Sequence, residues 1–279
     1  MVEPKRRRPS TRVQWAVVAI VGFYVGLVLL VPLAALMVTV ASDIGRVVRG
    51  IVDPSSLHAL MLSAVLALIA LIVNGAFGIA GALVLVRQRF WGRRVLDALV
   101  DMPLAVSPVM TGLAFLLLFG KNGWLRPALA YVGLDVAFAF PGLVIATLFV
   151  TLPFTVREVA LVLEEIGTSE EDAAATLGAS PWQIFWLVTL PNIRHGLTIG
   201  GTLTVSRALG EFGAVLVIGG AISGKTQTAT TFIHASMEER HETTAYGIAL
   251  LLAAAAAAAL AVLSKTRKNE RPTESAEGA

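Results

Sequence analysis

Two charged side chains, Arg207 and Glu211, interrupt an otherwise apolar stretch of the 279-residue chain. They are four residues apart, a spacing that places both on one face of a helix. An ionisable side chain inside a membrane costs roughly 3 kcal/mol or more, so such residues pair with each other or line a water-filled path. Two interpretations are therefore open. The pair fixes helix packing, or Arg207 attracts an anion into a path while Glu211 positions the arginine.

Two other segments match patterns that carry chemistry in other proteins. Residues 219–226 fit the phosphate-binding P-loop pattern letter for letter, but that loop requires a strand before it, and an apolar helix-length segment precedes it here. Residues 241–245 begin like a zinc-protease motif, with Ala245 in place of the second histidine. The sequence also has no cysteine. We therefore predict no catalytic residue, no metal site and no cofactor bound by this chain.

The elements that must position these residues are membrane helices. Apolar residues make up 56% of the chain and charged residues only 15%, against about 25% charged in an ordinary soluble domain. Residues 13–42 and 54–86 contain no Asp, Glu, Lys or Arg, and each run exceeds the ~20 residues that a spanning helix needs. This composition excludes a cytosolic enzyme, a disordered chain and a secreted disulfide scaffold.

Apolar runs of this kind predict an all-α membrane protein with six spans, at about 14–41, 57–86, 97–120, 137–157, 196–220 and 243–264. A basic N-terminus, 1–13, and a tail, 265–279, flank the transmembrane domain 14–264. With the N-terminus inside, 15 of the 22 Lys and Arg residues lie at cytoplasmic ends, six lie outside and Arg207 lies within a span. The positive-inside rule then places both termini in the cytoplasm. The pI near 9.5 is thus a topology signal and indicates no nucleic-acid partner.

The connection between the fourth and fifth spans, about 158–195, is long for an inside loop and predicts a functional segment. Thr168 or Ser169, with an acid three residues later, has capping-box spacing for a short helix. Gly178 is suited to a left-handed stop, and Ser180-Pro181 to the start of a second helix that ends at Leu190-Pro191. This helical hairpin either rests on the membrane or forms a docking surface for another protein.

The hairpin sequence resembles the EAA loop of permease subunits in ABC-type importers, here about 164–191. In that family the loop forms the coupling helix that sits in a cleft of the ATPase subunit. Asp172 stands in place of the family's glutamate and Val188 in place of its isoleucine, while the spacing from glycine to proline is intact. The resemblance assigns ATPase coupling to Asp172, Ala173, Ala174, Gly178, Ala179, Pro181, Leu190 and Pro191.

Four further segments, 102–108, 185–193, 207–215 and 224–228, look like the sulfate/thiosulfate permeases, and more specifically like the W-type member of their two unlike permease subunits. The similarity runs from about residue 60 to 220. Molybdate permeases share the segment 207–214, so that segment does not separate the two oxyanions. Residues 229–231 and 237–241 depart from the sulfate pattern at the outside loop.

The resemblance implies the type I ABC importer permease fold in a bacterial inner membrane, with the coupling hairpin between spans four and five. It implies a non-identical homologous permease, two ATPase subunits that bind ATP and Mg²⁺, and an extracytoplasmic sulfate-binding protein as partners. The predicted translocation path comprises Arg207, Gly210, Glu211, Gly213, Ser107 and Pro108. A molybdate or tungstate ABC permease, an ion-coupled secondary transporter and a structural membrane scaffold remain as alternatives.

Overall fold

The computed structural model describes residues 11–269, which form helices and no strand. Those helices are α1 (Thr11–Ser42), α2 (Ile44–Val52), α3 (Pro54–Arg87), α4 (Arg93–Ala105), α5 (Pro108–Phe119), α6 (Arg126–Tyr131), α7 (Phe140–Ile166), α8 (Ser169–Thr176), α9 (Pro181–Ile184), a π-helix (Phe185–Thr189), α10 (Leu190–Leu209), α11 (Gly213–Gly219), α12 (Ala229–Glu238) and α13 (Glu242–Asn269). The all-α prediction is confirmed for these residues. The predicted basic N-terminus and C-terminal tail lie largely outside them, at 1–10 and 270–279.

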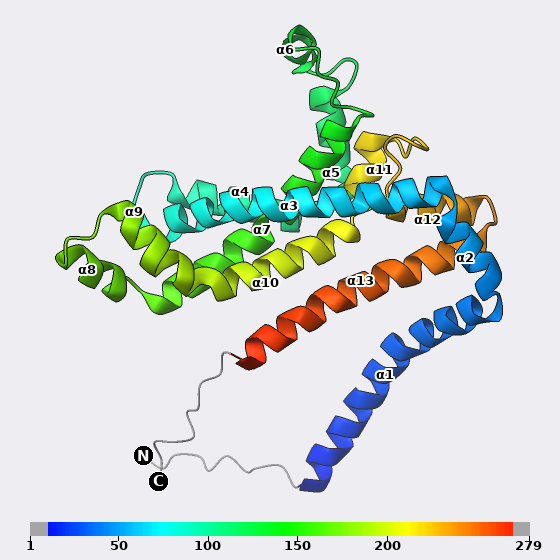
Figure 1. The fold of residues 1–279 in the computed structure, drawn as a ribbon, viewed down its shortest axis with the longest axis horizontal. Helices are drawn as coiled ribbons and strands as arrows, with labels where there is room; N and C mark the ends of the chain where they lie inside the picture. Colours follow the sequence, from blue (N-terminus) through cyan, green and yellow to red (C-terminus); the bar gives the residue numbers. More distant parts are fainter. Residues whose placement is uncertain (1–10, 270–279) are drawn as a thin grey trace, which may run out of the picture.

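Helices α3, α7 and α10 pack side by side and form the centre of the bundle, with α13 alongside (Figure 1). Small residues allow the close approach. A Cβ at Gly200 on α10 would lie 2.8 Å from the Cα of Thr155 on α7, and a Cβ at Gly78 on α3 would lie 2.6 Å from a methyl carbon of the same threonine. Small residues at such contacts are typical of helix packing in membranes, where close van der Waals contact drives association.

Buried polar side chains connect the same three helices. The Asn74 amide on α3 donates to the Thr151 hydroxyl on α7 at 2.7 Å and to the Leu148 carbonyl at 3.1 Å. The hydroxyls of Thr155 on α7 and Thr204 on α10 lie 3.0 Å apart. Because hydrocarbon offers no competing water, each such bond contributes roughly 0.6–2 kcal/mol to helix association.

The predicted spans are only partly confirmed as single helices. Four helices are long and apolar enough to cross a membrane, and two bent pairs, α4 with α5 and Pro181–Leu209 with α11, give six spans if each pair counts as one. The predicted third span, 97–120, is bent by 113° because Pro108 forces Ser107 into an extended conformation. The predicted fifth span, 196–220, is bent by 54° where the chain leaves helical geometry between Leu209 and Gly213.

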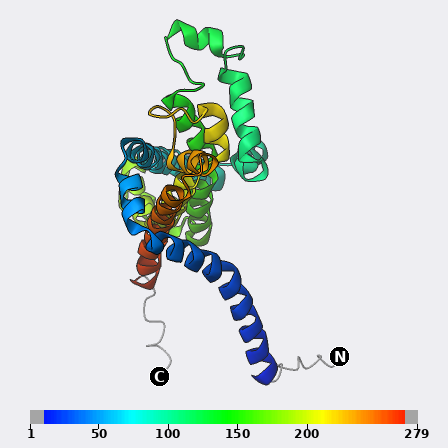
Figure 2. The same ribbon diagram turned by 90° about the vertical axis from the view of Figure 1, so that its right-hand side faces the viewer.

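Two parts of the chain project from the bundle on opposite sides. Helix α1 diverges from the bundle, and no residue of its most apolar stretch is buried. Helices α5 and α6 extend away on the other side (Figures 1 and 2). Side chains such as Phe23 and Leu30 on α1 and Leu117 on α5 are therefore exposed to what surrounds the isolated chain. In a membrane these apolar surfaces contact lipid or another subunit.

Helix α3 runs nearly the whole length of the bundle, from the α2 corner at one end to the α8–α9 hairpin at the other (Figure 1). Asp53 caps its start by accepting from the Ser55 amide at 3.1 Å, and the Ser55 hydroxyl also donates to this carboxylate. These two hydrogen bonds, the hydroxyl foremost, hold the pKa of Asp53 below its usual value. Helix α3 therefore begins at Pro54, three residues before the predicted second span, 57–86.

Candidate functional site

The segment between α7 and α10 forms the predicted helical hairpin at one end of the bundle. Helix α8 ends at a glycine in the left-handed region, Gly178, with φ +85°. Ala179 follows, and Ser180 caps α9, with Pro181 in its first turn. The Ser180 hydroxyl accepts from the Gln183 amide at 3.4 Å, and the Gln183 side chain accepts from the Ser180 amide at 2.8 Å. The predicted stop and restart are therefore confirmed.

Two predictions about the hairpin are wrong. Thr168 forms no capping bond to the α8 backbone, and its hydroxyl instead donates to the Asp172 carboxylate at 2.9 Å. The second helix does not end at Leu190-Pro191 but continues through the π-helix into α10. Pro191 has no N–H to donate to a preceding turn. In the π-helix immediately before it, the Leu190 amide donates to the Phe185 carbonyl, and this wider turn accommodates the loss without a break.

The hairpin presents a large apolar surface that the rest of the described chain does not cover. Leu177 is 89% exposed, Leu187 74% and Trp182 69%, and none of the eight residues of α8, Ala173 and Ala174 included, is buried. Trp182 and Trp186 pack edge to face at 5.5 Å between ring centroids. Exposed aromatic and leucine side chains gathered at one tip mark a site of protein or membrane contact.

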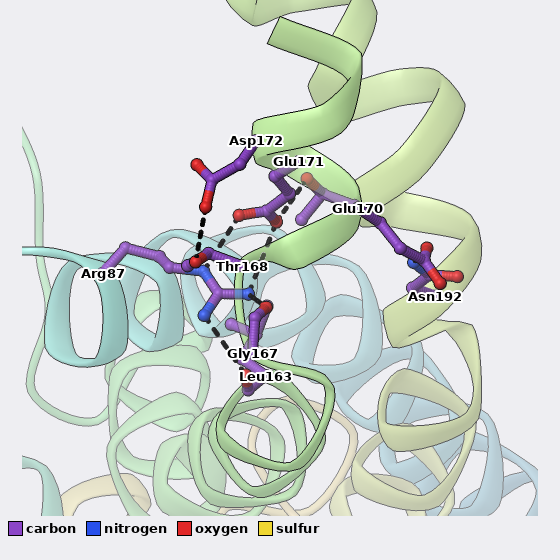
Figure 3. Close-up of polar contacts among 9 residues, drawn as sticks. Arg87, Leu163, Gly167, Thr168, Glu170, Glu171, Asp172 and Asn192 are labelled. Carbon is purple, nitrogen blue, oxygen red and sulfur yellow. Dashed lines mark hydrogen bonds and ion pairs between the residues drawn. The ribbon is translucent and has the colours of Figure 1, made fainter. Parts of the chain in front are cut away.

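Polar contacts of the first α8 turn hold this hairpin against the bundle (Figure 3). The Glu171 carboxylate lies 3.1 Å from Nε of Arg87, the last residue of α3, and accepts from the Thr189 hydroxyl at 2.8 Å. Arg87 also donates to the carbonyls of Leu163 and Gly167 at the end of α7. Glu171 thus joins the end of α3 to the π-helix that leads into α10, and Arg87 joins both to the end of α7.

The two bends in the broken spans lie against each other. A Cβ at Gly213, the first residue of α11, would lie 3.1 Å from the Cβ of Pro108, the first residue of α5, and 3.2 Å from the backbone nitrogen of Val109. One turn further, a Cβ at Gly112 would lie 2.7 Å from the Val217 side chain. Of the predicted path residues, Pro108 and Gly213 are therefore in contact where the two interrupted helices meet.

Arg207 and Glu211 form an ion pair at this crossing, with 2.7 Å between Nη1 and Oε2. The Glu211 side chain is 1% exposed and the Arg207 side chain 32% exposed. The expectation that both lie on one helical face is wrong, because α10 ends at Leu209 and Glu211 lies in the break. There its Oε1 accepts from the Ala214 amide at 3.0 Å, and its carbonyl accepts from the Thr230 hydroxyl at 2.6 Å.

A second charged cluster was not predicted. Arg157 on α7 lies 2.7 Å from both Asp97 and Asp101 on α4. In the sequence, Arg157 is one of the 15 Lys and Arg residues expected at cytoplasmic ends. The signal that identifies the cluster is the pair of acids four residues apart within an apolar segment, because such acids require a cationic partner.

The segment that matches the P-loop pattern has a structural arrangement of its own. It follows α11, a helix, and the Thr226 hydroxyl donates to the Gly219 carbonyl at 2.7 Å and accepts from the Ile222 amide at 3.0 Å. Thr226 is buried, so its hydroxyl closes this turn instead of facing a ligand. The zinc-protease-like segment 241–245 spans the start of α13.

Apolar spans, two of them broken and in contact beside an ion pair, with a helical hairpin at one end, are the features of a multi-pass membrane protein. Residues 74–267 match the family model of the binding-protein-dependent transport system inner membrane component, and the chain belongs to that family.

Two relatives and one solved structure agree with this assignment. The sulfate transport system permease protein CysW of Synechocystis is 44% identical over 88% of this chain and 90% of its own, and CysT of Escherichia coli is 39% identical over 83% and 84%. A bacterial ABC transporter that imports the acidic polysaccharide alginate has the same fold, with a TM-score of 0.76, 14% identity, and coverage of 93% of this chain and 97% of its own.

Proposed function

We propose that this chain is the permease subunit of an ATP-driven importer that carries sulfate or thiosulfate into the cytoplasm by alternating access. The observation that carries the proposal is the meeting of two broken spans beside Arg207, a partly exposed cation held by a buried carboxylate. Broken helices near the middle of a transporter are where substrates bind. The sulfate permeases among the relatives support an inorganic dianion as the substrate.

Arg207 attracts the dianion to the crossing, and Glu211 holds the guanidinium in place. Because conduction requires weak binding, the carboxylate also lowers the net attraction and lets the anion leave. Ser107, Pro108, Gly210 and Gly213 form the backbone of the crossing. The absence of a side chain at Gly213 lets the two bends approach closely, since a Cβ there would lie 3.1 Å from the Cβ of Pro108.

The α8–α9 hairpin is the surface on which an ATPase subunit docks. Asp172, Ala173 and Ala174 provide a small, acid-led face, and Gly178 and Ala179 form the tight stop between the two helices. Pro181 begins α9, while Leu190 and Pro191 begin α10 and so connect the docked hairpin to the helix that carries Arg207. Movement of the hairpin is thereby passed into the bundle as a rigid-body motion.

In this proposal the complete transporter lies in a bacterial inner membrane with both termini of this chain in the cytoplasm. It contains a homologous permease of different sequence, two ATPase subunits that hold ATP and Mg²⁺, and an extracytoplasmic binding protein that delivers the anion. The exposed faces of α1 and of α5 with α6 support contact with neighbouring subunits or lipid.

Radiolabelled sulfate uptake tests the substrate. A complex purified through a tag on this chain is reconstituted with its binding protein, and uptake is measured with a tenfold excess of unlabelled thiosulfate or of molybdate. The proposal predicts that thiosulfate competes and that molybdate does not. Competition by molybdate with no sulfate uptake would instead establish a molybdate or tungstate permease, which the shared segment 207–214 leaves open.

One observation favours a second class of function, an ion-coupled secondary transporter. Secondary transporters are also built around broken helices whose ends surround the substrate, and two of the spans here are broken. The α8–α9 hairpin, with its uncovered apolar tip, has no role in such a mechanism. The energy source of transport separates the two classes.

A further inference from the structure

Two helices, α3 and α10, run from the hairpin toward the Arg207–Glu211 ion pair. Helix α10 continues directly from the π-helix and carries Arg207, about 27 Å beyond Thr189 at 1.5 Å per residue. Helix α3 ends at its own hairpin contact, Arg87. Ser63 lies about 36 Å back along the same helix. Figure 1 shows both helices running along the bundle from the hairpin end.

At its far end, α3 holds the segment that positions Glu211. The buried Ser63 hydroxyl on α3 accepts from the amide of Ala229, the first residue of α12, at 2.8 Å. The next residue, Thr230, donates its hydroxyl to the Glu211 carbonyl at 2.6 Å. The backbone of Glu211 is therefore linked to α3 through Ala229 and Thr230, and to α10 through the bond from its amide to the Ala208 carbonyl.

Glu171 connects the two helices at the hairpin end. Its carboxylate pairs with Arg87 of α3 (Figure 3). It also accepts from the hydroxyl of Thr189, which leads into α10. The side chains of Arg87 and Glu171 are only about one-fifth exposed, at 18% and 22%. A charge-assisted contact with this degree of burial is stronger than one on an open surface.

We propose that Glu171 is a latch between α3 and α10, that is, a breakable contact that holds the two helices in register. Arg87, the last residue of α3, and Ser63, its tenth residue, are positioning residues. While the latch is closed, the relative register of the two helices is fixed, and so is the position of Arg207 relative to Glu211. Movement of α8 breaks or re-forms the Arg87 contact, lets α3 and α10 shift past each other, and changes the crossing where the anion passes. This inference rests on the proposed function.

The test measures ATP hydrolysed per sulfate transported in the reconstituted complex. R87A and E171Q are expected to raise this ratio about tenfold, the factor that corresponds to one hydrogen bond to a charged group. Their matched controls are R89A, which removes a nearby exposed arginine, and E170Q, which alters the adjacent acid bonded to Asn192. Both controls are expected to keep the wild-type ratio.

A double variant and a distant variant separate a latch from a merely structural contact. R87A/E171Q is expected to match the worse single variant, since both changes open one contact. S63A, far from the hairpin, is expected to raise the ratio as R87A does, and S63A/R87A to show no further increase. Independent sites this far apart would add their effects. Additivity in this cycle, or a wild-type ratio in both R87A and E171Q, would overturn the proposal.

R87K keeps the proposal testable if R87A fails to assemble. Lysine retains the charge facing Glu171 but cannot also bridge the Leu163 and Gly167 carbonyls, so a ratio between wild type and E171Q is expected. An R87K complex with the wild-type ratio beside a strongly uncoupled E171Q would contradict the role of Arg87. If the wild-type complex takes up no sulfate, the proposed function fails as well. If an active complex stays coupled in every variant, only the latch fails.

Discussion

Replacing Arg207 by methionine isolates the two roles that an intramembrane ion pair can have. The change keeps an unbranched side chain of similar length and removes the charge 2.7 Å from the Glu211 carboxylate. Glu211, with a side chain 1% exposed, then retains only the Ala214 amide as a donor. Breaking a buried ion pair by removing one partner costs about 3–5 kcal/mol, and the partial exposure of Arg207 places the expected value near 3 kcal/mol.

The opposite replacement is expected to cost less. In E211Q the glutamine oxygen can still accept from Ala214, and Arg207, 32% exposed, can be solvated, so about 1 kcal/mol is lost. The double variant R207M/E211Q leaves no unpaired charge and is expected to recover most of the stability that R207M loses. At roughly 2–4 °C per kcal/mol, R207M should lower the melting temperature of the complex by about 6–12 °C.

Thermal unfolding and sulfate uptake are measured on the same four proteins. If Arg207 attracts the anion, the double variant regains its melting temperature and still transports poorly. If the pair only fixes helix packing, the double variant regains both. Normal uptake by R207M/E211Q would therefore refute the assignment of Arg207 to the translocation path.

Three other substitutions test the hairpin and the core. G178V places a β-branched residue at φ +85° and is expected to leave the complex assembled but to lower ATP-dependent uptake at least about tenfold. Coupled transport by G178V would contradict the hairpin assignment. G200V forces a side chain against α7, 2.8 Å from the Cα of Thr155, and should lower the free energy of unfolding by about 1–3 kcal/mol, measured by thermal unfolding. An unchanged melting temperature would show that the α7–α10 contact is looser than described. N74L removes the amide that bonds Thr151 and should cost about 1–2 kcal/mol, a loss that N74Q restores only if its longer amide still reaches α7.

Composition and local backbone chemistry account for the features that the sequence predicts well. The charge-free runs 13–42 and 54–86 correspond to α1 and α3, because no other environment accommodates helices of that length without charge. Gly178 and the Ser180 capping box are also predicted, since both depend on residues within one turn. The resemblance to the binding-protein-dependent permeases was likewise visible in the hairpin motif, and the family match confirms it.

Features that depend on distant parts of the chain were not predicted. The 113° bend at Pro108 brings α5 against α11 at Gly112, a contact between distant segments that no local pattern contains. The π-helix arises where a continuous helix must accommodate Pro191, and the sequence alone offered a simple helix end instead.

The charged contacts between helices show the same limit. Arg87 and Glu171 are 84 residues apart, and Arg157 and Asp97 are 60 apart. In the sequence, Arg87 and Arg157 are two of the 15 Lys and Arg residues expected at cytoplasmic ends, and Glu171 is the acid three residues after Thr168. Each of those interpretations was sufficient for its own residue, so nothing in the local pattern called for a partner.

The energy source of uptake tests the central claim most directly. Proteoliposomes containing the complex purified through this chain are loaded with ATP on the ATPase side, and sulfate uptake is followed with ionophores that collapse all proton and sodium gradients. The account predicts uptake that persists under ionophores, requires the binding protein and stops when ATP is replaced by a non-hydrolysable analogue. Uptake that follows an imposed ion gradient and continues without ATP would contradict it.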